Sequence, residues 1–447
     1  MELQQLKQAL VKAAEAKGIK EYEIYYQKSE DINAETLRDQ ISGFSSGVSG
    51  GICFRCVVNG KMGYASGELL TEEAMADMVR RAVQNAECID ADGEAVIFHG
   101  SPAYAKLPQA EVKLADPSAV KDLALKLQNA MYQQSDKIAD GTQSAAVSMV
   151  SEVYLYNSSG LELSNRVGAS GAYASPVLRV GEEAHSAFEF GLGDDFEALK
   201  DLPKKAIDGA LAQFGAGLVK TGKYDVIFDG KQFRSILSAF ASAFSAKNAQ
   251  VGLSLLAGKE GKSVAAPCVT ITDDPMRPES PMKTPFDGEG VATYKKEVVK
   301  NGVLETLLYD LSTAAKAGKI STGNGQKAGY ASSVGIAPYN FSLSAGELSE
   351  EALLSTVKEG IYITELKGLH AGANPVTGDF SIESAGFMIR DGKKAEAVKS
   401  FTVAGNFFSL LTEIDGLSDT VKWGVPFGFT VFGSPDVLVR QMSIAGK

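Results

Sequence analysis

The 447-residue sequence predicts an α+β fold in two domains. Residues 1–220 are expected to form an N-terminal α/β domain that combines helices with antiparallel strands, and residues 221–447 a mainly antiparallel, barrel-like C-terminal domain. Two observations support this. Asn-Gly or Asp-Gly stands between apolar runs at three places, and such dipeptides favour hairpins because both turn positions need positive φ. Beyond about residue 247, helical spacing of apolar residues largely gives way to strand-like runs.

In the first half, helices and strands alternate. Leu3, Leu6 and Leu10 recur at helical spacing and predict an amphipathic helix that ends near Gly18. Strands are expected at residues 22–26 and 52–58, and the second returns through the turn at residues 59–60. Thr71 is placed to cap the next helix. The remaining predictions are a helix over 118–134, successive strands over 145–192 and a helix over 197–214.

The glycine-rich stretch 215–222 marks the predicted domain boundary. A strand at 224–228 and a helix at 232–247 are expected after it. The rest is predicted to be mainly strands, with hairpin turns at residues 301–302 and 391–392. Ser349 is expected to cap one further helix that ends near Gly360.

The composition narrows the classes of partner. Hydrophobic residues make up 45% of the chain, and the formal net charge of -11 is not interrupted by a basic tract. A diffuse acidic charge argues against nucleic-acid binding. No apolar stretch approaches a membrane span, no signal-peptide pattern is visible, and four cysteines do not make a disulfide framework. We therefore expect a cytoplasmic protein that binds neither nucleic acid nor membrane.

The three histidines, His99, His185 and His370, argue against a conventional zinc-protease site. Two imidazoles on one helix can share a zinc ion when they stand three to five residues apart, as in H-E-x-x-H. None of the three has such a neighbour. We therefore expect no metal ligands and no catalytic residues of this type in the chain.

Three weaker motifs are better explained by structure than by chemistry. Cys53 and Cys56 form a C-x-x-C inside a predicted strand, where residues three apart point to opposite faces, so buried structural cysteines are expected. Residues 47–51 match G-x-S-x-G, but a strand follows where a nucleophile elbow needs a helix, which favours a flexible loop. Residues 90–93 resemble a calcium loop with its glycine misplaced, and are predicted to form a turn. No nucleotide-binding motif is present.

Two polar stretches are harder to explain as scaffold. One combines residues 273–275 (DDP) with residues 285–291 (PFDGEGV). The other, residues 368–381, places a histidine, an amide, a carboxylate and a hydroxyl among glycines and a proline. Such a loop can hold polar groups for a ligand, or its side chains can cap its own backbone. From the residues alone both interpretations stand equally.

These stretches resemble the TldD/PmbA family, long labelled modulators of DNA gyrase. The resemblance is carried by four blocks: DDP…PFDGEGVAT (273–293), STGN (321–324), LHAGANPVTGDFSIESAGFMIRDG (369–392) and TVAGNFFSLLTEID (402–415). Their order and spacing are similar to those of the family across the C-terminal half. The N-terminal half resembles the family more loosely.

The resemblance also implies a branch within that family. TldD-like members hold zinc with an H-E-x-x-x-H motif on the helix after the first strand of the second domain, and with a cysteine near the C-terminus. Here Ser238, Ala239 and Ala243 stand at the motif positions, and residues 423–433 contain no cysteine. A hydroxyl and two methyl groups cannot hold zinc or activate its water. The sequence is therefore similar to the PmbA branch, also called TldE, which lacks these ligands.

This likeness implies a non-catalytic subunit of a two-component zinc metalloprotease that acts on unfolded peptides, including peptide-antibiotic precursors and antitoxins. No cofactor is expected in this chain; zinc would belong to a TldD-like partner in a heterodimer, and an extended peptide would bind beside sheet edges. An alternative is a free-standing homodimer that binds peptides or acts as a chaperone. A third hypothesis is an enzyme that uses His370 with Asp379 and Ser381. The candidate peptide-binding residues from the family motifs are Asp287, Glu289, Asn324, His370, Asn374, Asp379, Ser381 and Asn406.

Overall fold

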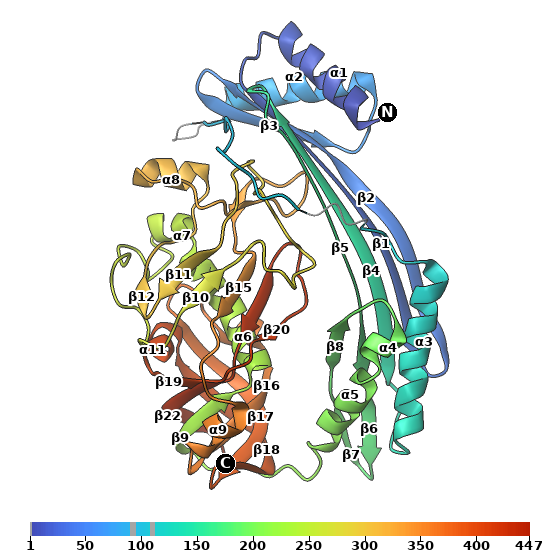
Figure 1. Cartoon of the computed structure of the whole chain (residues 1–447), viewed down its shortest axis with the longest axis vertical. Coiled ribbons are helices and arrows are strands. Elements are labelled where there is room, and N and C mark those ends of the chain that lie inside the picture. The colour runs from blue at the N-terminus through green and yellow to red at the C-terminus, as the bar shows by residue number, and fades with distance from the viewer. Residues whose placement is uncertain (1, 90–94, 108–111) are drawn as a thin grey trace.

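A computed structural model of the chain describes residues 2–89, 95–107 and 112–447. Helices make up 24% and strands 40% of the fold, which confirms the predicted α+β class. Residues 90–93, predicted to form a turn, lie outside the described residues. A long curved sheet from the first half of the chain stands beside a body, built by the second half, that contains a barrel (Figure 1).

The long sheet has six strands in the order β3-β2-β1-β4-β5-β8, and each neighbouring pair is antiparallel. Its strands are β1 (Tyr22–Leu37), β2 (Gln40–Val58), β3 (Lys61–Gly67), β4 (Gln143–Asn157), β5 (Glu162–Ser175) and β8 (Glu189–Leu192). A separate two-stranded sheet consists of β6 (Val177–Val180) and β7 (Glu183–Ser186).

Strands β1 and β2 are much longer than predicted, with 16 and 19 residues. The flexible loop predicted for residues 47–51 is therefore wrong, because these residues pair with β1 inside β2. Gly51 has a packing role there: a Cβ atom at this position would lie 2.6 Å from the ring of Tyr330, which belongs to the second half of the chain. The absent side chain thus lets the second half pack against the sheet.

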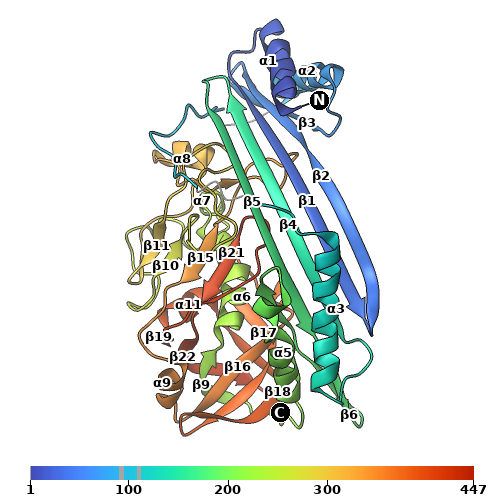
Figure 2. The same ribbon diagram turned by 45° about the vertical axis from the view of Figure 1, so that its right-hand side comes forward.

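The helices that accompany this sheet among the described residues are α1 (Leu3–Ala16), α2 (Glu72–Cys88), α3 (Pro117–Gln134), α4 (Phe196–Leu199) and α5 (Leu202–Leu211). The Thr71 side chain accepts a hydrogen bond from the N–H of Ala74, as expected of the cap of α2. Helix α3 packs on the side of the sheet away from the barrel (Figure 2). The predicted helix over 197–214 is divided, since α4 ends at Leu199 and α5 starts afresh at Leu202 with Pro203 in its first turn.

The second half contains a closed five-stranded barrel, in the order β18-β17-β16-β9-β22 with β18 also paired to β22. The barrel strands are β9 (Gly222–Phe228), β16 (Glu359–Lys367), β17 (Asp379–Arg390), β18 (Lys393–Asn406) and β22 (Val437–Ala445), and β19 (Ile414–Leu417) adds to β22. A second sheet has the order β12-β11-β10-β15-β21-β20. Its strands are β10 (Ile271–Asp273), β11 (Lys296–Lys300), β12 (Val303–Leu304), β15 (Asn340–Leu343), β20 (Lys422–Trp423) and β21 (Val431–Ser434), beside the short pair β13 (Gly325–Gln326) and β14 (Gly335–Ile336).

All three predicted hairpin turns are confirmed. Each dipeptide has positive φ at both positions, and the turns join β2 to β3, β11 to β12 and β17 to β18. The local chemistry of Asn-Gly and Asp-Gly therefore fixes these connections.

The helices of the second half are shorter than predicted. They are α6 (Gly230–Phe240), α7 (Ala246–Gln250), α8 (Leu311–Ala317), α9 (Glu350–Ser355), α10 (Leu369–Gly372) and α11 (Phe407–Thr412). The continuous helix predicted for 232–247 is wrong: residues 241–244 form a 3-10 turn before α7. The cause is tertiary, because the backbone of Phe244 and Ala246 bonds to that of Leu308 instead of continuing the helix. The Ser349 cap is confirmed, but its helix ends at Ser355 because β16 begins at Glu359.

The two cysteines of the C-x-x-C lie buried on opposite faces of β2. Cys56 packs among residues of α1 and α2, whereas Cys53 packs with Tyr25 and Phe286 where the sheet meets the second half. Both are free thiols, as expected of structural cysteines. Within the described ranges, no helix combines the length and apolar character that a membrane crossing requires.

Candidate functional site

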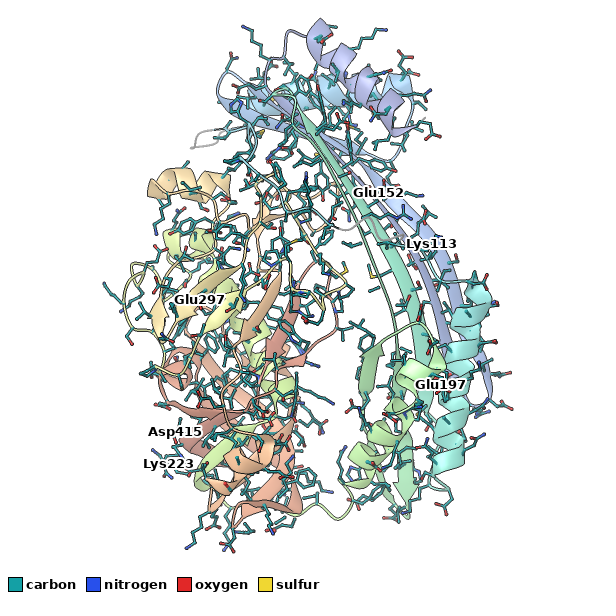
Figure 3. The ribbon with its side chains drawn as sticks, viewed as in Figure 1. Lys113, Glu152, Glu197, Lys223, Glu297 and Asp415 are labelled. Atoms are coloured by element: carbon teal, nitrogen blue, oxygen red, sulfur yellow. The ribbon has the colours of Figure 1, made fainter. Side chains whose placement is uncertain are left out.

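A cleft of about 530 Å³ lies between the lower end of the long sheet and the barrel. One wall comes from β7, the start of β8 and the end of α5, and the other from α6 and strands β16, β17 and β18. Side chains project into this space from both walls (Figure 3). The volume falls in the range of ordinary ligand sites. A second hollow, of about 520 Å³, lies near α7 and α8 and has Glu289 in its lining.

Two ion pairs connect the walls of the cleft. Lys231 Nζ, on the first turn of α6, lies 2.6 Å and 2.7 Å from the two carboxylate oxygens of Glu189 on β8. Lys399 Nζ on β18 lies 2.8 Å from Glu183 Oε1, which is also 3.0 Å from His185 Nε2. Hydrogen bonds from Lys399, His185 and the Gly215 N–H lower the pKa of Glu183 to about 2. The first-half wall is therefore held to the barrel by charge.

A partly buried cluster of charged side chains holds the start of α6 beside the cleft. Asp229 caps the helix by accepting from the Lys231 N–H, and Asp436 accepts from the Gly230 N–H at 2.6 Å. Lys422 Nζ contacts both carboxylates, at 2.8 Å and 2.7 Å. Burial raises the pKa of Asp436, whereas at Asp229 the effect of burial is outweighed by the charge and hydrogen bond of Lys422, and the pKa is lowered. The cluster sets the direction of α6 along the cleft.

The cleft exposes backbone at the edge of a strand. Strand β16 pairs with β9 only over residues 360–363, and the last bond on that side runs from the Asp229 N–H to the Ile363 carbonyl. Residues 364–367 continue β16 along the cleft. On the side of β16 where β9 has ended, the Gln232 side chain bonds to these residues. Its Nε2 donates to the Thr364 carbonyl at 2.7 Å and its Oε1 accepts from the Leu366 N–H at 3.1 Å.

Strand β8 presents a second edge. It is the last strand of the long sheet and pairs only with β5 among the described strands. The Gly193 N–H bonds to the Ser170 carbonyl, so in an antiparallel ladder the N–H and C=O of Phe190 and Leu192 point away from β5. Figure 1 places β8 on the side of the sheet nearest the barrel. The long sheet thus turns the free edge of β8 toward the barrel, and β16 turns toward the same space an edge that the Gln232 side chain pairs.

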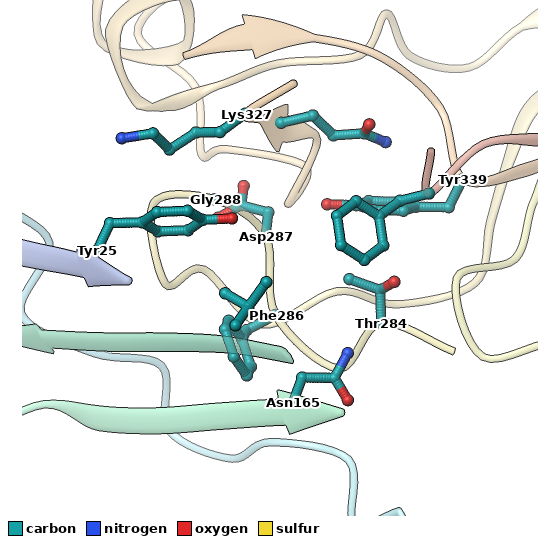
Figure 4. A pocket seen from close by; sticks show the side chains of 11 residues that line it. Tyr25, Asn165, Thr284, Phe286, Asp287, Gly288, Lys327 and Tyr339 are labelled. Carbon is teal, nitrogen blue, oxygen red and sulfur yellow. The ribbon is translucent and has the colours of Figure 1, made fainter. Parts of the chain in front are cut away.

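Three of the eight predicted site residues lie together, but outside this cleft. Asp287, Glu289 and Asn324 are buried where the second half meets the long sheet. Asp287 accepts hydrogen bonds from the N–H groups of Glu289, Val291 and Gly325, and Asn324 donates to Asp273 at 2.8 Å. Beside Asp287 is a cavity of about 20 Å³, enough for one water molecule, into which the hydroxyls of Tyr25 and Tyr339 point from opposite sides (Figure 4).

Further charged groups that sequence reasoning missed complete this junction. Arg55 on β2 donates to Glu23 at 2.8 Å and lies 3.6 Å from Glu289, which joins the sheet to the second half. Burial raises the pKa of Asp287 and of Glu289, and lowers that of Lys327. One signal was available: an arginine between Phe54 and Cys56, inside an apolar run, indicates a buried ion pair.

The other five predicted residues lie around the loop that precedes β17. Asn406 Nδ2 donates to Asp379 Oδ1 at 2.9 Å, and the Asn374 side chain accepts from the Val376 N–H. These side chains thus bond within the loop and its neighbour α11. His370 and Ser381 are exposed, and the described residues include no hydrogen bond that joins either of them to Asp379. The geometry assembles no catalytic triad from this loop.

The positions at which the family resemblance leads us to expect the zinc motif carry no metal-binding groups. Ser238 is exposed on α6, and Ala243 is buried in the 3-10 turn beyond its end. Over the described parts of the chain, no group of three or more His, Cys, Asp or Glu side chains is placed to bind a metal ion.

Comparisons with known proteins agree along most of the chain. Models of PmbA/TldA metallopeptidase domain 1, central domain and C-terminal domain match residues 22–86, 111–214 and 221–446. A Haemophilus influenzae protein named metalloprotease PmbA homolog is 25% identical and covers 99% of this chain and 97% of its own. These models divide the first half in two, so the two-domain division at residue 220 stays a prediction.

Two solved structures share the fold. One, from Thermotoga maritima and assigned provisionally as a modulator of a DNA gyrase, is 28% identical with a TM-score of 0.89, and the alignment covers 99% of this chain and 100% of that one. TldE from Thermococcus kodakarensis is 24% identical, with the same TM-score and the same coverage. The four sequence blocks, the barrel with its neighbouring long sheet, and the matched models together establish that the chain belongs to the PmbA/TldD family.

Proposed function

We propose that this chain is the PmbA/TldE-type, non-catalytic subunit of a two-component zinc metalloprotease that acts on unfolded peptides. In this proposal the chain binds extended peptide in the cleft between the long sheet and the barrel. Its partner is a TldD-like chain that supplies the zinc and the chemistry, and the substrates belong to the class of peptide-antibiotic precursors and antitoxins.

One observation carries the proposal. The first turns of α6 line a cleft that is large enough for a ligand, and farther along the chain the positions of the family's zinc motif, which lie outside the cleft lining, hold Ser238, Ala239 and Ala243. None of these side chains can bind zinc or activate water. A helix that borders a ligand-sized cleft but carries no zinc ligands suits a non-catalytic subunit.

The two strand edges at the cleft, β8 and the end of β16, support peptide as the ligand. Backbone N–H and C=O groups at an edge bind any extended chain through its main chain, with little demand on its sequence. That property suits substrates that share an unfolded state and no common sequence.

The test is reconstitution with a TldD-like zinc-bearing chain. Each chain alone and the mixture are analysed for bound zinc and for cleavage of an unfolded peptide. We expect no stoichiometric zinc and no cleavage from this chain alone, and cleavage from the mixture. Stoichiometric zinc in this chain, removable with loss of its own activity, would contradict the proposal. Peptide binding by a stable homodimer, with no gain of cleavage in the mixture, would favour the free-standing peptide-binding protein.

A further inference from the structure

The side chain of Gln232 occupies the place of a strand at the edge of β16. Its amide nitrogen donates to the Thr364 carbonyl and its amide oxygen accepts from the Leu366 N–H. These two backbone groups lie two residues apart and face the same side. A neighbouring strand bonds to such a pair through its own N–H and C=O.

The position of Gln232 follows from the way β9 ends. Strand β9 covers this side of β16 as far as residue 363, and the chain then turns into α6 at Asp229. Gln232, on the first turn of α6, bonds to the edge of β16 just beyond the last hydrogen bond between β9 and β16. Without it, a carbonyl and an N–H would face the cleft unpaired, which is unfavourable wherever water has limited access.

We propose that Gln232 acts as an internal stand-in for bound peptide, and that an extended peptide adds to the edge of β16 at residues 364–366 by displacing this side chain. The inference rests on the proposed function, since it assumes that the cleft takes peptide. Gln232 is then a positioning residue that keeps the edge paired while the cleft is empty and competes with ligand for it.

The surroundings fit an incoming strand. Residues 364–367 all line the cleft of about 530 Å³. Phe188 lines the opposite wall with 57% of its surface exposed, and so offers an apolar contact for alternate side chains of the peptide. The exchange replaces two hydrogen bonds of the glutamine with two of the peptide main chain. Because these two bonds involve only the peptide main chain, they place no demand on the peptide sequence.

Gln213 provides a matched control within the same cleft. Its Nε2 donates to the carbonyl of Ser186 at the end of β7 and to that of Gly209 on α5, so it lines the cleft and bonds to backbone without bridging a carbonyl and an N–H of the same strand. Gln232→Ala and Gln213→Ala each remove the same amide from the same cleft.

The experiment measures binding of a fluorescein-labelled, unstructured peptide of alanine, serine, threonine and valine to the full chain by fluorescence anisotropy. Gln232→Ala should raise its affinity about three- to tenfold, because the competing hydrogen bonds are gone. Gln213→Ala should not raise the affinity, because this side chain does not compete for the β16 edge. A peptide N-methylated at alternate residues should bind more weakly to the wild type and to Gln232→Ala.

Hydrogen exchange at the Leu366 amide gives a second readout. It should be faster in free Gln232→Ala than in the free wild type, and peptide should slow it again in the variant. Unchanged or weaker binding by Gln232→Ala, or Leu366 exchange in the variant that saturating peptide does not slow, would overturn the inference.

The two proposals fail separately. If no peptide binds this chain while the reconstituted pair still cleaves, the stand-in role and peptide binding in this cleft are overturned, and the role as a non-catalytic subunit stands. If Gln232→Ala binds more tightly but no partner restores cleavage, the reverse holds.

Discussion

Glu189 and Lys231 join the two halves of the molecule across the cleft, with Lys231 Nζ within 2.7 Å of both carboxylate oxygens. The lysine stands on the first turn of α6, which the partly buried cluster of Asp229, Asp436 and Lys422 holds in place. The glutamate begins the short edge strand β8. This pair therefore ties a four-residue edge strand to a helix whose start is held in place.

Replacing Lys231 with methionine should loosen β8 without unfolding the protein. The methionine keeps the apolar stem but removes the charge that Glu189 contacts. Amide exchange over residues 189–192 should become several-fold faster in Lys231→Met, because the strand then keeps only its bonds to β5. Lys204→Met is the control, since Lys204 pairs with Asp208 within α5 and does not reach the barrel. Equal exchange in the wild type and Lys231→Met would show that the ion pair does not hold the edge strand.

Arg55→Met should destabilise the fold strongly. Arg55 is buried and lies between Glu23 and Glu289, so its loss leaves two buried carboxyl groups without their cation. The expected cost is about 3–5 kcal/mol in the free energy of unfolding. Urea denaturation measures it, with Arg80→Met as the control; Arg80 forms a half-exposed pair with Asp77 on α2 and should cost no more than about 1 kcal/mol. A cost below that of the control would mean that the junction does not depend on this charge.

Restoring histidines at the zinc-motif positions should have unequal costs. Ser238 is exposed, so Ser238→His is expected to change stability by no more than about 0.5 kcal/mol. Ala243 has no exposed surface and lies in the core of the second half, so Ala243→His overpacks it and should cost about 1–3 kcal/mol or more. Denaturation of both variants gives the comparison. Equal stability would indicate that the 3-10 turn at residues 241–244 adapts to a larger side chain.

The contacts of Glu183 should weaken in acid. Its folded-state pKa of about 2 is below the unfolded value of about 4.3, so its ionised form stabilises the folded state above about pH 4.3, and this contribution is lost as the pH falls toward 2. The unfolding midpoint of the wild type should therefore exceed that of Glu183→Gln at pH 6, and the difference should shrink at pH 3. Glu182→Gln, at the exposed neighbouring position, serves as the control. A difference that does not change with pH would exclude Glu183 as its source.

His370→Ala should leave partner-dependent cleavage within about twofold of the wild type, because the imidazole is exposed and neither Asp379 nor Ser381 is bonded to it. Cleavage assays on the reconstituted pair measure this. A loss of a hundredfold or more would revive the hypothesis of a catalytic His370.

What could be predicted from the sequence is what short-range chemistry determines. The Thr71 cap and the three hairpin dipeptides behave as their residue types require. The length of β1 could not be predicted in the same way. Its second part, residues 27–37, is mostly polar, and it is a strand because β2 and β4 pair with it on both sides. Pairing with distant partners overrides local preference there.

The candidate site was less accessible to prediction for a related reason. The family motifs point to Asp287 and Asn406, whose side chains bond within buried or loop structure. Gln232, Lys231 and Glu189 are ordinary polar residues in the sequence. They acquire the role proposed for them only because the fold brings α6, β8 and the end of β16 to one cleft.

The closure of the barrel has a consequence for biosynthesis. Its first strand, β9, lies between β16 and β22, and β22 is the last strand of the chain. On the ribosome β9 therefore emerges long before either neighbour. The edge that pairs with β16 stays open until residues 359–367 have been made, and the edge that pairs with β22 until residues 437–445 have been made. Pairings this distant in sequence form slowly and expose strand edges that can aggregate in the meantime. We expect the nascent second half to depend on chaperones more than the first, whose β1–β2 hairpin can form as soon as it is synthesised.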